Sequence, residues 1–445
     1  MPSADDLFEI ALRDHRAGDI DRAAQCYESL LREQPNHADA WHYWGVTATQ
    51  CGRPDLAVER IRRALELRPS NAGYLLNLGV AYQALGRTAD AEECFRRAVE
   101  AKPDFPEAHN NLAGILHARG CHAEAMEHWK RALSLRPDLA DAHYNLAVVL
   151  IERGAFEDAL AHAHEAVRLQ PSHAPSHWVL ANALAELKRY AEAEAAYRQA
   201  IQLDANHAAA HSNLSHVLRR QGKFDEALLS ATEALRLDPK SADAHNEAGA
   251  VLGCLDRAAD AAVHLWRSLW FRPNNPEAHT NLGTLCNNRR QFEQACSHFR
   301  EALRLQPDLA EASVGLARAL NRMGKSDEAI ELVREGLKRR PTNAGEHAQL
   351  AEYLANQGLV HEAIAEFREA IRLNPDLTVA QSSLLITQNF VPELSRNDLF
   401  LEHRRITDAI ADPPGERIHH TEELIRLPNS FCSYLAPANA PQVAP

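Results

Sequence analysis

The chain has 445 residues, of which 45% are hydrophobic and 24% are charged, proportions typical of a folded protein and not of a disordered one. Aromatic residues make up only 6%, so Ala and Leu supply most of the apolar content, and both favour helices over strands. The net charge of −13 at pH 7 excludes a general attraction for phosphate backbones or anionic lipid, so we expect neither a nucleic acid nor a membrane as partner.

The N-terminal segment MPSADDLFEIALRDH is acidic and lacks the apolar core of a signal peptide. The eight cysteines are scattered and include no C-x-x-C pair, which is typical of reduced thiols and not of a disulfide framework or a zinc site. No apolar run has the length of a membrane span. We therefore expect a cytoplasmic protein.

A motif of 34 residues then recurs in eleven copies between residues 4 and 377. We number its positions so that position 32 is a proline, which only the copy containing Ala205 lacks. Position 20 is alanine in all eleven copies, and position 15 is glycine in eight. Within a copy, apolar residues recur at helical spacing, break at position 15 and recur again.

Each of these positions has a physical reason. Glycine at position 15 can adopt the left-handed conformation that ends a helix, and the proline stops the second helix. Alanine at position 20 lets the two helices approach closely, where a larger side chain would overpack. A single helix–turn–helix copy cannot bury its apolar face alone, so the sequence predicts an all-α solenoid of stacked copies.

This pattern resembles the tetratricopeptide repeat family. The resemblance implies a right-handed superhelix whose first helices line an inner groove. It implies no particular ligand, because such repeats serve many partners.

Position 6 of the first helix is asparagine in five copies, and we predict that these residues bind a partner. An amide offers both donors and an acceptor, so a row of amides can hold the backbone of an extended segment whatever its sequence. The alternative is that asparagine is merely tolerated there on a solvated face, and the sequence does not decide between the two. The candidate partner-binding residues are Asn77, Asn111, Asn145, Asn213 and Asn281.

Position 4 is histidine in seven copies, which raises the question of a metal. Packed helices lie about 8–10 Å apart, too far for neighbouring copies to share an ion. Position 4 also lies with positions 7, 8 and 11 on the stripe that we expect to be buried, so we predict a packing role with some sensitivity to pH. These residues are His109, His143, His177, His211, His245, His279 and His347.

No motif for nucleotide, metal-dependent or serine-nucleophile chemistry occurs, such as G-x-x-x-x-G-K-[ST], H-E-x-x-H or G-x-S-x-G. We expect no catalytic residue, no metal and no cofactor. Position 5 offers Asn110, Tyr144, Trp178 and Ser212 instead of a lysine or arginine that would clamp a terminal carboxylate.

After residue 377 the register fails. Residues 378–411 are predicted to form capping or connecting helices, with Ser395 and Asp398 as a capping box, and residues 412–445 a loop-rich, flexible tail. The segment LLITQNFVPELSRNDLFLEHRR resembles the connector after the repeats of bacterial O-linked N-acetylglucosamine transferases. The segment beginning RITDAIADPPGERIHH resembles a stretch inside the catalytic region of that family.

The resemblance implies a tail from which most of the catalytic region is missing. We therefore predict a protein-interaction scaffold that binds a protein or peptide segment and is not an enzyme as written. The alternative is a glycosyltransferase dependent on UDP-N-acetylglucosamine, either truncated or acting with a complete transferase. The sequence leaves the oligomeric state open.

Overall fold

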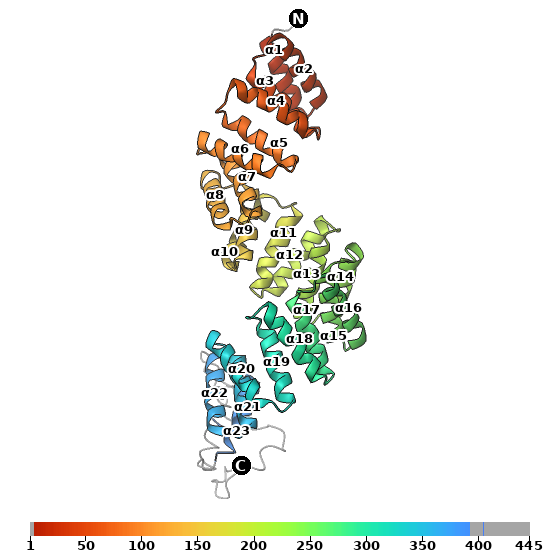
Figure 1. Ribbon diagram of the computed structural model, residues 1–445, viewed down its shortest axis with the longest axis vertical. Helices are drawn as coiled ribbons and strands as arrows, with labels where there is room; N and C mark the ends of the chain where they lie inside the picture. Colours follow the sequence, from red (N-terminus) through yellow and green to blue (C-terminus); the bar gives the residue numbers. More distant parts are fainter. Residues whose placement is uncertain (1–3, 392–403, 405–445) are drawn as a thin grey trace, which may run out of the picture. The chain divides into compact units, whose positions relative to one another are not determined.

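The computed structural model describes residues 4–391 and 404, and within them every regular element is an α-helix (Figure 1). The predicted all-α fold is thereby confirmed. Two compact units, residues 1–237 and 238–445, are distinguished by their internal contacts. No described helix combines the length and the hydropathy that a bilayer span requires.

The helices of the first unit are α1 (Ala4–Arg16), α2 (Ile20–Glu33), α3 (Ala38–Gln50), α4 (Pro54–Leu67), α5 (Ala72–Ala84), α6 (Thr88–Ala101), α7 (Pro106–Ala118), α8 (His122–Leu135), α9 (Ala140–Glu152), α10 (Phe156–Leu169), α11 (Ala174–Glu186), α12 (Tyr190–Leu203), α13 (Ala208–Arg220) and α14 (Phe224–Leu237). Those of the second unit are α15 (Ala242–Cys254), α16 (Ala258–Phe271), α17 (Pro276–Asn288), α18 (Phe292–Leu305), α19 (Ala310–Arg322), α20 (Ser326–Arg339), α21 (Ala344–Asn356), α22 (Val360–Leu373) and α23 (Thr378–Gln388).

Within each unit, every helix packs on the helix before it and the helix after it. An odd-numbered first helix and the even-numbered second helix after it form one copy of the motif, as α7 and α8 do (Figure 1). First helices of adjoining copies also touch, for example α7 with α9 and α15 with α17. This neighbour-by-neighbour stacking is the predicted solenoid arrangement, whereas its right-handed superhelical path stays a prediction.

Position 15 has the left-handed backbone that the sequence predicts. All eight glycines there have φ between 69° and 82°. The three copies without glycine carry Lys188, Asp256 and Arg290, and these have φ of 59°, 58° and 61°. The residue after this position then donates its N–H back to the first helix, as Arg87 does to the Tyr82 carbonyl at 2.9 Å. The turn therefore keeps one conformation whatever residue occupies it.

Position 20 is fully buried in all eleven copies, which confirms the close helix approach predicted there. A second close approach occurs in α5, where Gly79 faces the ring of Phe95 from α6. The Phe95 side chain has no exposed surface and fills the space that a side chain at residue 79 would occupy. Small residues thus set the distance between the helices of a copy.

Helix α23 continues the stack beyond the repeats by packing on α22. Its Ala380 and Leu384 join an apolar cluster with Ile364 and Phe367 of α22. The predicted domain boundaries at residues 377 and 411 stay predictions. The proposed capping box at Ser395 and the tail at 412–445 lie outside the described residues.

Candidate functional site

The five position-6 asparagines lie on first helices, and all of them are half-buried. Half-burial fits both a binding role and a tolerated residue at a partly solvated face, so both interpretations stay open. They are Asn77 in α5, Asn111 in α7, Asn145 in α9, Asn213 in α13 and Asn281 in α17.

Two of these amides bond a side chain at position 5 of the preceding copy. Asn77 Nδ2 lies 2.8 Å from His42 Nε2, and Asn281 Nδ2 donates to Asn246 Oδ1 at 2.9 Å. Position 5 before Asn213 is a tryptophan, and this amide instead donates to Asn182 Oδ1 at 3.0 Å. These three asparagines tie neighbouring first helices together, so part of their hydrogen-bonding capacity is used inside the protein.

Among the described residues, the side chains of Asn111 and Asn145 receive no such partner. Position 5 before Asn111 is Leu76, which has no polar group to offer. Position 5 before Asn145 is Asn110, but its Oδ1 already accepts a hydrogen bond from Trp129 Nε1 at 3.1 Å. Helices α7 and α9 are in contact, so two half-exposed, unengaged amides stand on adjoining first helices. We call Asn111 and Asn145 the amide pair.

The position-4 histidines serve the repeat itself. In six of them Nε2 bonds the backbone carbonyl of position 32 in the preceding copy, as His109 does to Pro103 at 2.9 Å. Trp41 makes the same contact through Nε1 to the Pro35 carbonyl at 2.8 Å. Only His109 and His245 are fully buried, and the others are half-buried. The packing stripe is therefore polar at its outer edge.

A second histidine, at position 23, bonds the first ring in four copies, and three of these first rings, those of His109, His143 and His245, also make the carbonyl contact. Because Nε2–H is given to the carbonyl, Nδ1 of the first ring is left as an acceptor for Nδ1–H of the second. The fifth equivalent is an ion pair of His347 Nδ1 with Glu366 at 2.6 Å. The Nδ1–Nδ1 pairs are His109–His128 (2.8 Å), His143–His162 (2.9 Å), His245–His264 (3.1 Å) and His279–His298 (3.2 Å).

The direction of the pKa shift depends on whether the partner of the first histidine is a second histidine or a glutamate. Burial lowers the pKa of the second histidine in the four His–His pairs, namely His128, His162, His264 and His298. Burial also opposes protonation of His347, but its hydrogen bonds to Glu366 and the Pro341 carbonyl outweigh burial and raise its pKa. Sequence reasoning missed position 23, although a histidine 19 residues after the first is visible in each of the four copies.

The second unit carries an exposed apolar ridge on α16 that the sequence analysis did not single out. Val263, Trp266 and Trp270 are 51%, 56% and 83% exposed. They are spaced by three and four residues and so share one face of the helix. Side chains this large and this exposed add an apolar surface outside the first helices.

Family models described as tetratricopeptide repeat match the chain over more than half of its length. The matched segments are residues 36–104, 76–140, 123–174, 144–208, 208–241, 289–353 and 347–377.

Two curated relatives are similar over a short segment. A probable UDP-N-acetylglucosamine–peptide N-acetylglucosaminyltransferase SPINDLY of Solanum lycopersicum is 56% identical over 41 residues, which are 9% of this chain and 4% of the relative. The protein of the same description from Petunia hybrida is 51% identical over 41 residues, with the same coverage of both chains. The chain therefore spans a very small part of either relative.

Among solved structures, the crystal structure of the APC/C hetero-tetramer Cut9–Hcn1 is similar, with a TM-score of 0.52 and 16% identity. The match covers 87% of this chain and 96% of that one. At this identity the likeness supports the helical-repeat fold and says nothing of partners.

Proposed function

The chain belongs to the tetratricopeptide repeat family, and from this premise we propose that it is a protein-interaction scaffold that holds an extended segment of a partner protein against its first helices. The single observation that carries the proposal is the amide pair. Asn111 and Asn145 stand on adjoining helices with their donors and acceptors unengaged among the described residues. A half-buried amide gains a hydrogen bond when a peptide backbone reaches it.

The spacing of helices suits an extended ligand. Packed helices lie about 8–10 Å apart, and an extended chain advances about 3.3 Å per residue. Amides on adjoining first helices would therefore meet equivalent backbone groups about every third residue of the segment. Because the contact is to backbone, this part of the site reads conformation and not side-chain sequence. The net charge of −13 disfavours strongly acidic segments.

A matched set of asparagine variants tests the proposal. Peptides are selected from a displayed random library against the immobilised full chain, and the best binder is titrated by fluorescence anisotropy. Each lost amide removes about 1–1.5 kcal/mol of hydrogen bonding, so Asn111→Ala with Asn145→Ala should weaken binding by roughly 30–150-fold. Circular dichroism should show unchanged helicity and nearly unchanged melting, since neither amide has an internal partner among the described residues.

The control is the pair Asn213→Ala and Asn281→Ala, whose amides are engaged inside the protein. These changes should lower the melting temperature while changing peptide affinity by less than about threefold. Binding that survives loss of the amide pair would refute the proposal. Binding that is lost only in the control would move the site to the other copies.

A second candidate function rests on the short similarity to the two plant transferases. We propose as this alternative that the chain takes part in sugar transfer from UDP-N-acetylglucosamine, either itself or by presenting an acceptor protein to a complete transferase. Calorimetry with UDP tests the first form, and co-purification with a transferase from the source cells tests the second. Saturable UDP binding would favour the enzyme, and the absence of both signals would leave the scaffold alone.

A further inference from the structure

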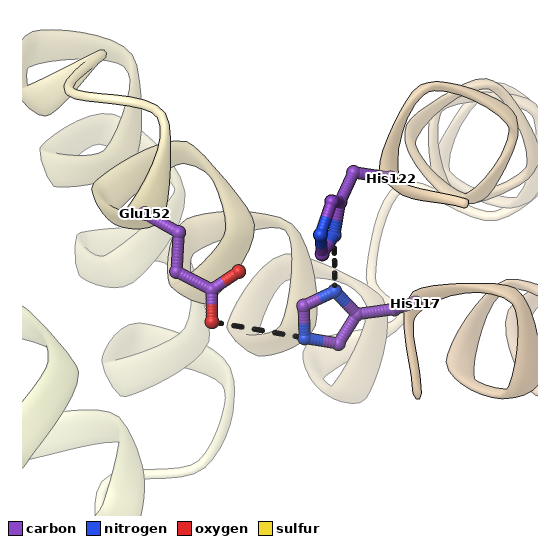
Figure 2. A group of neighbouring side chains, drawn as sticks. All are labelled: His117, His122 and Glu152. Atoms are coloured by element: carbon purple, nitrogen blue, oxygen red, sulfur yellow. Dashed lines mark hydrogen bonds and ion pairs between the residues drawn. The ribbon is translucent and has the colours of Figure 1, made fainter. Parts of the chain in front are cut away.

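Three potential metal ligands meet at the turn end of α7, away from the histidine pairs and the amide pair. His117 lies in the last turn of α7, His122 is the first residue of α8 and Glu152 is the last residue of α9. Figure 2 shows the His117 ring between the other two side chains. His117 Nδ1 is 3.0 Å from His122 Nδ1, and His117 Nε2 is 3.8 Å from a Glu152 carboxylate oxygen.

The backbone of the repeat brings these positions together. The contact from position 12 to position 17 across the turn recurs as Ser326 Oγ donating to Asn321 Oδ1 at 2.9 Å. The contact from position 12 to position 13 of the next copy recurs between His15 and Gln50 at 2.9 Å. The repeat fold therefore brings these three positions together in other copies as well, but only the junction of α7, α8 and α9 places three metal-ligand side chains at them.

That junction is singular in the sequence. Across the eleven copies, only the fourth has histidine at both position 12 and position 17, and the copy after it supplies glutamate at position 13. Elsewhere these positions hold residues such as threonine, alanine, phenylalanine or asparagine.

The cluster also differs from the four histidine pairs in its openness. In each pair for which the carbonyl bond is described, the first ring is closed by a backbone carbonyl on Nε2 and a histidine on Nδ1. His117 instead has an anionic oxygen near Nε2, and its side chain is 26% exposed while that of Glu152 is 49% exposed. The His117 and Glu152 side chains are therefore open to solvent on this face.

We propose that His117, His122 and Glu152 bind a Zn²⁺ ion that links the fourth copy of the repeat to the fifth. Neutral imidazole nitrogen and carboxylate oxygen are zinc ligands, and three protein ligands leave a fourth tetrahedral position for water. Ligands at 2.0–2.1 Å from one tetrahedral ion lie about 3.3 Å apart. One ligand atom from each residue already lies within 4.8 Å of the other two, so side-chain rotations alone can gather them.

Calorimetric titration of Zn²⁺ into the metal-free full chain at pH 7.5 tests the site. We expect one saturable site per chain, and Glu152→Gln and His122→Asn should each weaken it by at least about tenfold, since even residues that only support a metal ligand contribute about that much. His143→Asn is the matched control. It removes from α9 a histidine that pairs with His162, and it should leave the affinity unchanged.

Thermal melting gives a second readout that does not depend on heat of binding. Zn²⁺ should raise the melting temperature of the wild type and of His143→Asn, because the three ligands come together only in the folded chain. At the same Zn²⁺ concentration it should raise the melting temperature of Glu152→Gln by less. Several weak sites that His143→Asn abolishes, or a single site that neither Glu152→Gln nor His122→Asn changes, would overturn the proposal.

Discussion

Replacing Gly79 by alanine should destabilise the first unit, although alanine is the better helix former. The added Cβ would lie 2.4, 2.7 and 2.9 Å from three ring carbons of Phe95. Atoms in proteins do not approach this closely, so the ring or α5 must move. The Phe95 side chain has no exposed surface and cannot swing into solvent. Overpacking of this kind costs about 1–3 kcal/mol of unfolding free energy.

Gly114→Ala is the matched control, because Gly114 is also interior to a first helix but a Cβ added there would meet no atom within 4 Å. Both changes gain about 1 kcal/mol of helix propensity. Only Gly79→Ala also incurs the clash with Phe95. We therefore expect Gly114→Ala to be up to about 1 kcal/mol more stable than the wild type, and Gly79→Ala to lie about 1–3 kcal/mol below Gly114→Ala.

Urea unfolding followed by circular dichroism measures this difference. Because repeat arrays can unfold in parts, the midpoints of the three proteins are compared instead of extrapolated free energies. Near-ultraviolet circular dichroism of folded Gly79→Ala should also change, since the Phe95 ring must shift. Equal midpoints for the two variants would refute the reasoning, because the space above Gly79 would then be available without cost.

Three further variants follow from the fold. Arg290→Gly should raise the urea midpoint by the equivalent of about 0.5–1 kcal/mol, since φ of 61° is strained for arginine but not for glycine, and a lower midpoint would contradict this. Burial lowers the pKa of His42 to about 4 against the opposing charge of Asp39, so the unfolded chain takes up a proton below pH 6.5 that the folded chain refuses. The wild type should therefore lose up to ~3 kcal/mol of unfolding free energy as the pH falls from 6.5 to 4. Between pH 7.5 and pH 5, the melting temperature of His42→Phe should fall less than that of the wild type. An equal fall in both proteins would argue against this assignment. Ala125→Leu adds three carbons at a fully buried position and should lower the melting temperature by the equivalent of about 1–3 kcal/mol, a loss that would be absent if the helices of the copy could separate freely.

Sequence periodicity was sufficient for the fold because two positions carry most of the geometry. Alanine at position 20 predicted the close approach of the helices, and glycine at position 15 predicted the left-handed turn. The register extends this prediction to Asp256 and also to Lys188 and Arg290, whose residue types alone argue against positive φ. Flanking helices fix the turn, so the position decides the backbone and the residue only changes its cost.

The candidate site was less predictable, because its polar contacts join residues 31 or 35 positions apart. Nothing at Asn77 or Asn281 itself indicates that the amide is already engaged. The partner stands in the preceding copy, and whether it can accept depends on its own neighbours, as Asn110 shows through its bond with Trp129. Distinguishing Asn111 and Asn145 from the other three therefore required side-chain positions.

The histidines illustrate a different omission. Along position 4, from copy to copy, the helix spacing rules out a shared ion. The contacts that form run across the helix hairpin to position 23, within one copy. His117 and His122 also meet across the turn of one helix hairpin, so comparing the same position from copy to copy does not reveal their contact.

The contacts of position 4 span six residues to the preceding carbonyl and 19 residues to the second histidine. Neither of these separations along the sequence depends on how many copies of the repeat come before. Inserting or removing a whole copy of 34 residues inside one unit leaves every such bond with an equivalent partner. A change of 33 or 35 residues would instead rotate the following helices out of phase. The array can thus be lengthened or shortened only by whole copies, and duplication of one copy is the simplest event that makes it longer.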